Sequence, residues 1–387
     1  MTEKLYYQDA YIKEFEAKIL SVAPCERGYD VILDKTAFFP EEGGQSADTG
    51  LIGESRVIDV YEKNQCIHHI TDLHPGVGEV FCRLDFETRF EKMQCHTAEH
   101  ILCGIIHTLY GYENVGFHLG DDVVTFDISG VLTDEQIKNV EILANRAVYA
   151  NIKIETLFPK EGELDALEYR SKLDLTSGVR LVKIGEIDTC ACCAPHVANT
   201  GEIGIIKIID YMKHRGGTRI FMLAGERAFF DYCERQANIK KISAMLSAPQ
   251  LMTAKVLEEY MKESDATRSA LKQARIKLAE AYADAVAPVE GSAVFLFPEF
   301  SVPELIAFCN IAAKKLGKTL VALSGEELDY KYVICSSDDL SGKVKEINLA
   351  LSGRGGGRGN MVQGSFSSSL AQIKSYFIDD VENAIFN

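Results

Sequence analysis

Two histidines, His96 and His100, stand four residues apart in the segment His-Thr-Ala-Glu-His. Residues at this spacing share one face of an α-helix, so both imidazoles can reach a single metal ion if the segment is helical. Ile101 and Ile105 then pack on another face of the same helix. Such a pair of histidines also arises by chance, and a second group of ligands elsewhere in the chain is needed to support a metal site.

The segment from Asp188 to His196 supplies such a group, because it contains three cysteines and a histidine. Cys192 and His196 complete four nitrogen and sulfur donors for a tetrahedral zinc ion, and Cys190 or Cys193 could replace Cys192. The alternative is a set of buried free thiols beside a structural histidine. Two half-sites within one expected domain favour the metal.

The first half-site differs from that of helical metalloproteases. In those enzymes a glutamate that serves as the base follows the first histidine directly. Here Thr97 holds that position and Glu99 precedes the second histidine. The segment therefore lacks the glutamate that would serve as the base of a metalloprotease.

A loop rich in glycine and aromatic residues runs from Thr36 to Gln45, with Pro40 and the pair Gly43-Gly44 inside it. Paired glycines allow the backbone to approach a ligand closely, and the side chains at the two ends of the loop could donate or accept hydrogen bonds there. An ordinary hairpin loop explains the same spacing, and spacing alone favours that explanation.

The composition indicates a cytoplasmic, soluble protein of two or three domains. The chain has 387 residues, of which 47% are hydrophobic, and it contains no apolar run of about 18 residues. Residues 1–13 lack the apolar core of a signal peptide. Eleven cysteines, an odd number without small-domain spacing, indicate reduced thiols rather than a disulfide framework.

The formal charge of -16 argues against nonspecific binding of nucleic acid over the whole surface. Basic residues nevertheless concentrate in three places, at 213–219, 240–241 and 354–358. Each could be a solvated loop or a local basic groove.

The pattern of apolar residues predicts an α+β protein. Short runs in residues 1–90 predict a small β-barrel at 17–22, 29–33, 56–61, 66–70 and 79–84. Residues 91–235 are expected to form an α+β zinc-binding domain. Its expected elements are a helix over 95–110, a turn at 116–120, a strand over 123–128, a helix from Thr133 or Asp134 to Ala150, a strand over 152–158, an acidic helical stretch to about 173, and strands at 179–184 and 204–211.

The rest of the chain is expected to contain a helical spacer over 236–288, which Pro249 interrupts, and a small α/β domain over 289–387. The latter's expected elements are strands at 292–297, 319–324 and 332–336 and helices at 302–316, 340–350 and 367–387. Within it, the glycine-rich segment 353–361 reads as a loop. Its backbone N–H groups, Arg354 and Arg358 could contact phosphate, or the loop could simply be flexible.

Taken together, these motifs resemble the editing module of alanyl-tRNA synthetase and its freestanding relatives, the AlaX family. The resemblance rests on His96–His100, Gly116–Gly120, Cys192–Gly204 and the loop 36–45. It extends through Arg219 to Glu226, and the helical spacer with the glycine-rich segment is similar to the C-terminal domain of the synthetase. The order of the parts is that of the long AlaX form, without an aminoacylation portion.

The resemblance implies a zinc-dependent hydrolase that removes a wrong amino acid, mainly serine, with glycine as a second candidate, from tRNA(Ala). It implies one Zn²⁺ per chain, which either polarises the ester carbonyl or orients the terminal ribose and a water. The implied zinc ligands are His96, His100, Cys192 and His196.

The resemblance also assigns residues to the substrate. Thr36 and Gln45 match the loop that lines the amino-acid pocket, where they would act in catalysis and binding together with Gly44. His118 is either a pocket residue or a core histidine. Arg219 is expected to contact the tRNA end, and Arg354 and Arg358 are expected to bind tRNA in a C-terminal domain that could also form a homodimer.

One departure from the family pattern lies inside the metal motif. The family has Gly-Gly-Thr between the metal-binding cysteine and histidine, whereas this chain has Cys193-Ala194-Pro195. Pro195 removes a backbone N–H, and Cys193 adds a second thiol beside the site. The alternative function is therefore a noncatalytic tRNA-binding protein with a structural zinc.

Overall fold

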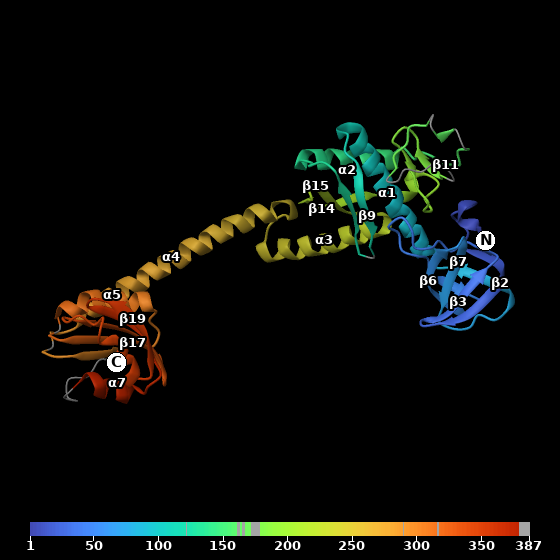
Figure 1. Cartoon of the computed structure of the whole chain (residues 1–387). Helices are drawn as coiled ribbons and strands as arrows, with labels where there is room; N and C mark the ends of the chain where they lie inside the picture. The colour runs from blue at the N-terminus through green and yellow to red at the C-terminus, as the bar shows by residue number, and fades with distance from the viewer. Residues whose placement is uncertain are drawn as a thin grey trace. The chain divides into compact units, whose positions relative to one another are not determined.

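The computed structural model describes residues 1–120, 122–160, 163–164, 167–171, 179–288, 290–315 and 317–378 (Figure 1). The chain folds into two compact units, Met1–Lys241 and Ile242–Asn387. Both units combine helices with sheets, which confirms the expected α+β class.

The N-terminal part of the first unit is a closed β-barrel. Inward and outward residues alternate along its longest strand, so that Phe15, Ala17 and Ile19 face the core while their neighbours face water. A short parallel pair, β1 (Glu3–Lys4) and β4 (Lys35–Thr36), lies beside it. The barrel strands, in spatial order, are β2 (Glu14–Cys25), β3 (Gly28–Leu33), β7 (Cys66–Thr71), β6 (Ser55–Lys63), β5 (Gly50–Ile52) and β8 (Gly78–Leu84).

Helix α1 (Phe86–Tyr110) follows the barrel and begins nine residues before the expected start at Cys95. It ends at Gly111, whose φ of 68° suits a left-handed C-cap. Near its start, Arg89 is 1% exposed and binds Asp48 as well as the carbonyl oxygens of Ala10 and Ala37. The guanidinium thus joins the helix to the loops of the barrel.

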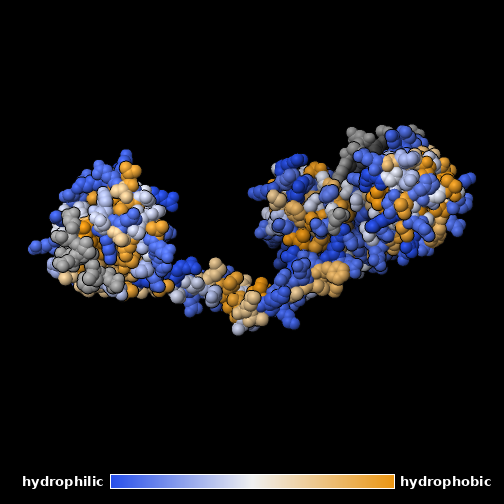
Figure 2. All heavy atoms as spheres, turned by 90° about the horizontal axis from the view of Figure 1, so that it is seen from below, coloured by the Kyte–Doolittle hydropathy of each residue, from blue (hydrophilic) through white to orange (hydrophobic). Residues whose placement is uncertain are grey.

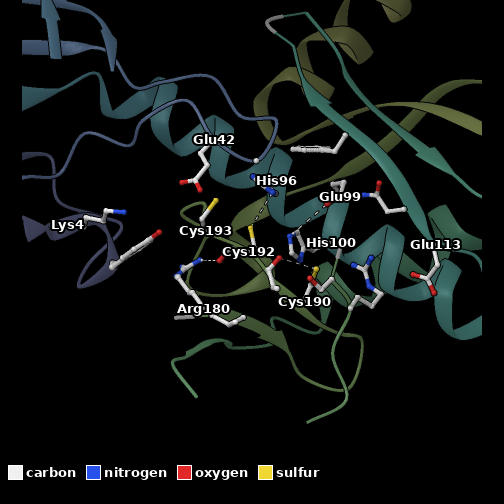
Figure 3. A pocket seen from close by; sticks show the side chains of 18 residues that line it. Lys4, Glu42, His96, Glu99, His100, Glu113, Arg180, Cys190, Cys192 and Cys193 are labelled. Carbon is white, nitrogen blue, oxygen red and sulfur yellow. Dashed lines mark hydrogen bonds and ion pairs between the residues drawn. The ribbon is translucent and has the colours of Figure 1, made fainter. Parts of the chain in front are cut away.

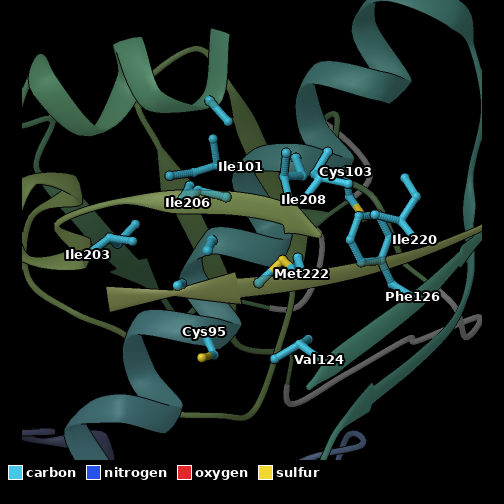
Figure 4. Packing of buried hydrophobic residues seen from close by; sticks show 14 of the residues in the cluster. Cys95, Ile101, Cys103, Val124, Phe126, Ile203, Ile206, Ile208, Ile220 and Met222 are labelled. Atoms are coloured by element: carbon cyan, nitrogen blue, oxygen red, sulfur yellow. The ribbon is translucent and has the colours of Figure 1, made fainter. Parts of the chain in front are cut away.

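Helix α1 packs in a core shared with α2 (Asp134–Tyr149) and a four-stranded antiparallel sheet (Figure 4). Thr133 caps α2 in a capping box with Gln136, as expected for this N-cap. Ile101, Ile206 and Met222 lie in the fully buried centre of this core. The sheet strands are, in order, β14 (Ile206–His214), β15 (Gly217–Ala224), β10 (Val124–Ile128) and β9 (Asn114–Leu119).

A three-stranded sheet completes the first unit and carries the second half-site. It consists of β11 (Ile154–Leu157), β12 (Leu181–Ile184) and β13 (Asp188–Ala191). The acidic helical stretch expected from Phe158 to about residue 173 is not found in its described part, residues 159–160, 163–164 and 167–171, which form no α-helix; Arg170 instead pairs with Cys190 beside β13. The rest of that stretch lies outside the described residues. Helix α3 (Gly225–Leu246) begins in the first unit and continues past its end at Lys241, and Pro249 follows the helix, as expected for a break between helices.

The second unit contains α4 (Thr253–Ala285) and a five-stranded sheet. The expected C-terminal helix is shorter, α7 (Leu370–Phe377), and residues 379–387 lie outside the described part. The remaining elements are β16 (Ala293–Leu296), α5 (Val302–Ala312), β17 (Thr319–Glu326), β18 (Asp329–Ser336), α6 (Val344–Ala350), β19 (Gly353–Arg358) and β20 (Met361–Phe366).

Two segments that the sequence predicted as irregular are strands. Residues 116–119 of the expected turn belong to β9, because they pair with β10 across the sheet. The expected glycine-rich loop is the hairpin of β19 and β20. A Cβ atom on Gly355 would lie 2.6 Å from the hydroxyl of Tyr332 and 2.4 Å from the carbonyl oxygen of Gln363. Glycine here permits close strand packing rather than a flexible loop.

Hydrophilic residues cover much of the face shown in Figure 2, with smaller hydrophobic patches between them. This distribution agrees with the large excess of acidic residues. Within the described residues, no helix has the length and apolar character that a membrane span requires.

Candidate metal centre

Four side chains from distant parts of the chain converge at one place beside a pocket, and Figure 3 shows His96, His100 and Cys192 in the wall of that pocket. His96 and His100 come from α1, and Cys192 and His196 come from the segment that follows β13. Their donor atoms all lie within 4.8 Å of one another. The structure therefore brings together the four residues that the sequence nominated as zinc ligands.

Each of the three histidines has its Nδ1 atom engaged by another residue of the protein. His96 Nδ1 lies 2.9 Å from Gln45 Oε1, and His100 Nδ1 lies 3.1 Å from Asp188 Oδ2. Both partners are acceptors, so each Nδ1 donates a proton to its partner, and Nε2 is the ring atom left to face a metal.

His196 follows the same arrangement through Thr97. The hydroxyl of Thr97 donates to the carbonyl oxygen of Met93 at 2.7 Å, and it can therefore accept from His196 Nδ1 at 3.0 Å. The Nε2 atom of His196 then faces Cys192 Sγ at 3.3 Å. A set of three imidazoles and one thiolate in this state fits a tetrahedral zinc ion.

Cys192 is the sulfur donor that the geometry selects. Burial raises the pKa of its thiol, but the imidazoles of His96 and His196 outweigh burial and hold that pKa well below the usual range. Burial raises the pKa of Cys190 to about 11 and also raises the pKa of Cys193. Only Cys192 joins all three histidines in one cluster, whereas Cys190 groups with His100 and Asp188.

The buried carboxylate of Asp188 holds His100 in place and is itself held by Arg170. Arg170 binds it through Nε at 2.7 Å and through Nη2 at 2.8 Å. These contacts lower the pKa of Asp188 against the effect of burial, with the bond to His100 as the largest favourable cause. An ionised Asp188 is a strong acceptor that raises the basicity of a histidine ligand.

The unusual Cys193-Ala194-Pro195 sequence has a fixed place in the structure. Arg180 donates through Nη1 to the carbonyl oxygens of Cys192 and Ala194, both at 2.8 Å. Ala194 is fully buried against Tyr6 and Phe39. The segment is thus clamped from both sides, and its position does not depend on the glycines of the family pattern.

Three of the four donors, His96, His100 and Cys192, line a pocket of about 590 Å³. Its wall includes Glu99, Asn114, Lys4, Tyr7 and Arg180, and Figure 3 shows Glu99 on the side opposite Lys4 and Arg180. From the loop 36–45, the described lining includes Glu42 and Gly43. Charged side chains of both signs thus surround the cluster.

Thr36 and Gln45 lie behind this wall rather than in it. Both are fully buried and neither belongs to the described lining of the pocket. Thr36 donates to Nε2 of His69 at 2.9 Å, because His69 Nδ1 donates to the carbonyl oxygen of Val31. Gln45 contacts His96, and its own Nε2 has no hydrogen-bond partner among the described residues.

The other nominated residues of the first unit lie on or next to the four-stranded sheet. Gly44 accepts a backbone bond from Leu119 at 2.9 Å, and a Cβ on Gly44 would lie 2.6 Å from the carbonyl oxygen of Phe117. His118 is exposed on β9, so it is not a core histidine. Arg219 binds both carboxylate oxygens of Asp127 at 2.7 Å.

The remaining nominated residues, Arg354 and Arg358, belong to the second unit. Both are exposed on β19.

Several residues of the site had no role in the sequence analysis. Glu99 had a usable signal, because it lies three residues after His96 and therefore on the same helical face. Asp188, Arg170 and Arg180 had none, since their contacts depend on how distant segments fold together.

A family model that matches part of this chain indicates the class of protein to which that part is similar. Residues 179–221 match the family described as the second additional domain of threonyl and alanyl tRNA synthetases. This stretch contains β12, β13 and the second half-site, together with β14 and most of β15.

Relatives that align with nearly all of this chain narrow the class of protein further. The alanyl-tRNA editing protein AlaX-L of Pyrococcus horikoshii is 29% identical over 394 residues, which cover 96% of each protein. The alanine–tRNA ligase of Ignicoccus hospitalis is 30% identical over 93% of this chain and 40% of the ligase. That of Halorubrum lacusprofundi is 30% identical over 92% of this chain and 40% of the ligase. This chain thus spans about two fifths of the length of these ligases.

Among solved structures, the C-Ala domain of Aquifex aeolicus alanyl-tRNA synthetase aligns with 22% of this chain and 86% of that domain. The sequence identity is 20% and the TM-score is 0.20, too low to support a structural argument. The sequence matches confirm the expected resemblance: this chain is a relative of the long alanyl-tRNA editing protein AlaX-L and of alanyl-tRNA synthetases.

Proposed function

We propose that this protein is a trans-editing hydrolase that deacylates misacylated tRNA(Ala), mainly Ser-tRNA(Ala) and also Gly-tRNA(Ala). The observation that carries the proposal is the cluster of three histidines and Cys192, of which His96, His100 and Cys192 line a pocket. The near full-length similarity to a protein named for alanyl-tRNA editing supports the choice of substrate.

The proposed cofactor is one Zn²⁺ held by His96, His100, Cys192 and His196. When bound, it would supply a Lewis acid next to the ester carbonyl. The protein's part is to fix the donors: Gln45, Asp188 and Thr97 each orient one imidazole. The proposed catalytic contribution of Gln45 is thus the positioning of His96.

Thr36 is proposed to act on the substrate indirectly, through the loop that it holds in place. Its hydroxyl donates to His69 and accepts from the backbone N–H of Phe38 at 3.1 Å, so both of its hydrogen-bonding roles are filled. It would hold the start of the loop whose later residues, Glu42 and Gly43, line the pocket. Serine would then be recognised by the loop that Thr36 shapes.

The tRNA itself is proposed to contact both units. In the first unit, Arg219 and the exposed His118 are the proposed contacts near the 3′ end, with Gly44 allowing close backbone approach in the loop. In the second unit, Arg354 and Arg358 extend from β19 to solvent and could pair with phosphates. The second unit is also the proposed surface for forming a homodimer.

The test is a deacylation assay with Ser-tRNA(Ala), Gly-tRNA(Ala) and Ala-tRNA(Ala), using protein whose zinc content has been measured. We expect faster release of serine and glycine than of alanine. His100→Ala should lose both metal and activity, while Cys233→Ala, which changes an exposed cysteine, should retain both. If zinc-loaded protein cleaves none of the three esters faster than buffer, the noncatalytic tRNA-binding function replaces this one.

A further inference from the structure

Glu99 is a buried carboxylate in the pocket wall, and the chemistry proposed above gives it no role. It is 3% exposed and lies on the face of α1 that carries His96 and His100. Its Oε2 atom is 4.0 Å from Nε2 of His100, and Figure 3 shows the two side chains next to each other. The carboxylate therefore borders the place where the substrate would meet the metal donors.

The two oxygens of Glu99 have different surroundings. Oε1 accepts hydrogen bonds from Nδ2 of Asn114 and from Sγ of Cys103, the latter at 3.1 Å. Hydrogen bonds of this kind fix the orientation of a carboxylate. Oε2 is the oxygen closer to His100. The side chain thus presents Oε2 toward the metal donors.

No lysine or arginine forms an ion pair with Glu99 within the described part of the chain. Arg170 lines the same pocket, but it is bound through two nitrogens to Asp188. A buried charge is costly unless a charge of opposite sign or strong hydrogen bonds compensate it. The proposed Zn²⁺ beside His100 would compensate part of this charge, and the hydrogen bonds to Oε1 compensate more. Oε2 still offers an acceptor to a ligand that brings a positive charge of its own.

An aminoacyl ester brings one such charge on the amino acid itself, its α-ammonium group. Standard bond lengths and angles place the ammonium nitrogen about 2.5 Å from the ester carbonyl carbon. If the ammonium donates to Oε2 over about 2.8 Å, the carbonyl carbon necessarily lies within about 5.3 Å of Oε2, the sum of these lengths. This distance is longer than the 4.0 Å between Oε2 and His100 Nε2, so an ester held by Glu99 can place its carbonyl carbon next to the metal donors.

We propose that Glu99 binds the α-ammonium of the aminoacyl ester and makes the pocket selective for esters with a free α-amino group over N-blocked esters. This inference rests on the proposed deacylase function. It assigns Glu99 a specificity role that is distinct from holding the metal, and it predicts that peptidyl and N-acetylated esters are poor substrates.

The test compares Ser-tRNA(Ala) with N-acetyl-Ser-tRNA(Ala) in the wild type, Glu99→Gln and Glu87→Gln. Glutamine preserves the shape and can still accept from Asn114 and Cys103. We expect Glu99→Gln to lower kcat/KM for Ser-tRNA(Ala) about tenfold to a hundredfold, to leave the slow N-acetyl reaction unchanged and to keep its zinc. Glu87 is exposed at the start of the same helix, so its variant should match the wild type.

A binding measurement separates recognition from turnover. The probe is 3′-amino-3′-deoxyadenosine acylated with serine through a stable amide, with and without an N-acetyl group. We expect Glu99→Gln to weaken binding of the free-amine probe by the same factor and to leave the acetylated probe unaffected.

Other outcomes overturn the inference. Equal slowing of both esters would make Glu99 a general catalytic or structural residue, and loss of zinc would make it part of the metal site. A wild type that cleaves both esters equally well would refute the selectivity while leaving the deacylase function intact. A zinc-loaded wild type that cleaves neither ester would reject the deacylase function itself.

Discussion

His96 donates through Nδ1 to Oε1 of Gln45 at 2.9 Å, so a loop next to the barrel orients a metal-donor side chain of α1. Both residues are buried, and the bond is formed away from water. The family resemblance implied a role for Gln45 on the substrate. Because its side chain contacts His96, we propose that it acts through that histidine.

Replacement of Gln45 should therefore change the affinity for zinc more than it changes the selection of substrate. We expect Gln45→Leu to weaken zinc affinity about tenfold to a hundredfold, because His96 loses the acceptor that fixes its ring and tautomer. Zinc competition with a chelator measures this directly. Gln8→Leu, at an exposed position, is the control. Unchanged affinity in Gln45→Leu would remove it from the support of the metal site.

Asp188 should contribute to stability as well as to metal binding. In Asp188→Asn, the partly buried Arg170 loses its charged partner, and we expect the free energy of unfolding to fall by about 3 kcal/mol. Urea unfolding of the metal-free protein isolates this effect from zinc binding. The exposed pair of Asp231 and Arg235 provides the control, since Asp231→Asn should cost less than about 1 kcal/mol. Equal losses would contradict the prediction.

The buried His69 predicts a loss of stability in mild acid. Burial lowers the pKa of His69 to about 4 from the ordinary value of 6.5. Of the nearby charges, His68 lowers this pKa further and Asp30 raises it, both by less than burial does. Between these two values the unfolded chain binds more protons, so stability should be full above pH 6.5 and fall by up to about 3 kcal/mol as the pH approaches 4.

This pH dependence can be assigned to His69 by comparison with His69→Gln. Urea unfolding of both proteins at pH 7.5 and pH 4.5 gives the difference in their pH sensitivity, in which the contributions of other carboxylates and histidines largely cancel. The wild type should lose more stability than the variant. Identical losses would show that His69 is protonated as easily in the folded state as in the unfolded state.

The exposed arginines of β19 should contribute to tRNA binding through phosphate contacts. We expect Arg354→Gln and Arg358→Gln each to weaken binding and to reduce the slope of log K against log salt by about one. Lys331→Gln changes an exposed residue of β18 and tests whether any loss of positive charge in this sheet has the same effect. A salt dependence unchanged in both arginine variants would argue against contacts at β19.

Local periodicity predicted much of the fold, but not every element. The helical spacing of His96 and His100 and the cap at Thr133 are local signals, and both agree with the structure. Gly116–Leu119 and the glycine-rich hairpin were read as irregular because glycine usually marks turns. In both segments glycine is needed because neighbouring strands of the same sheet approach closely. The sequence alone does not show which strands will be neighbours.

The site was predictable as a set of donors but not as an assembly. Cys192 and His196 could be nominated because their side chains bind zinc wherever they stand. The choice of Cys192 over Cys190 and Cys193 depends on distances across the fold. For the same reason, the burial of Thr36 behind the pocket wall could not be read from its loop.

The guanidinium of Arg89 has a consequence for dividing this protein into fragments. It ties the first turn of α1 to Asp48 and to the backbone at Ala10 and Ala37. A recombinant piece that starts at residue 91 would omit this anchor and Gln45 as well. The smallest fragment in which to study zinc binding should therefore begin at the N-terminus and include the whole barrel.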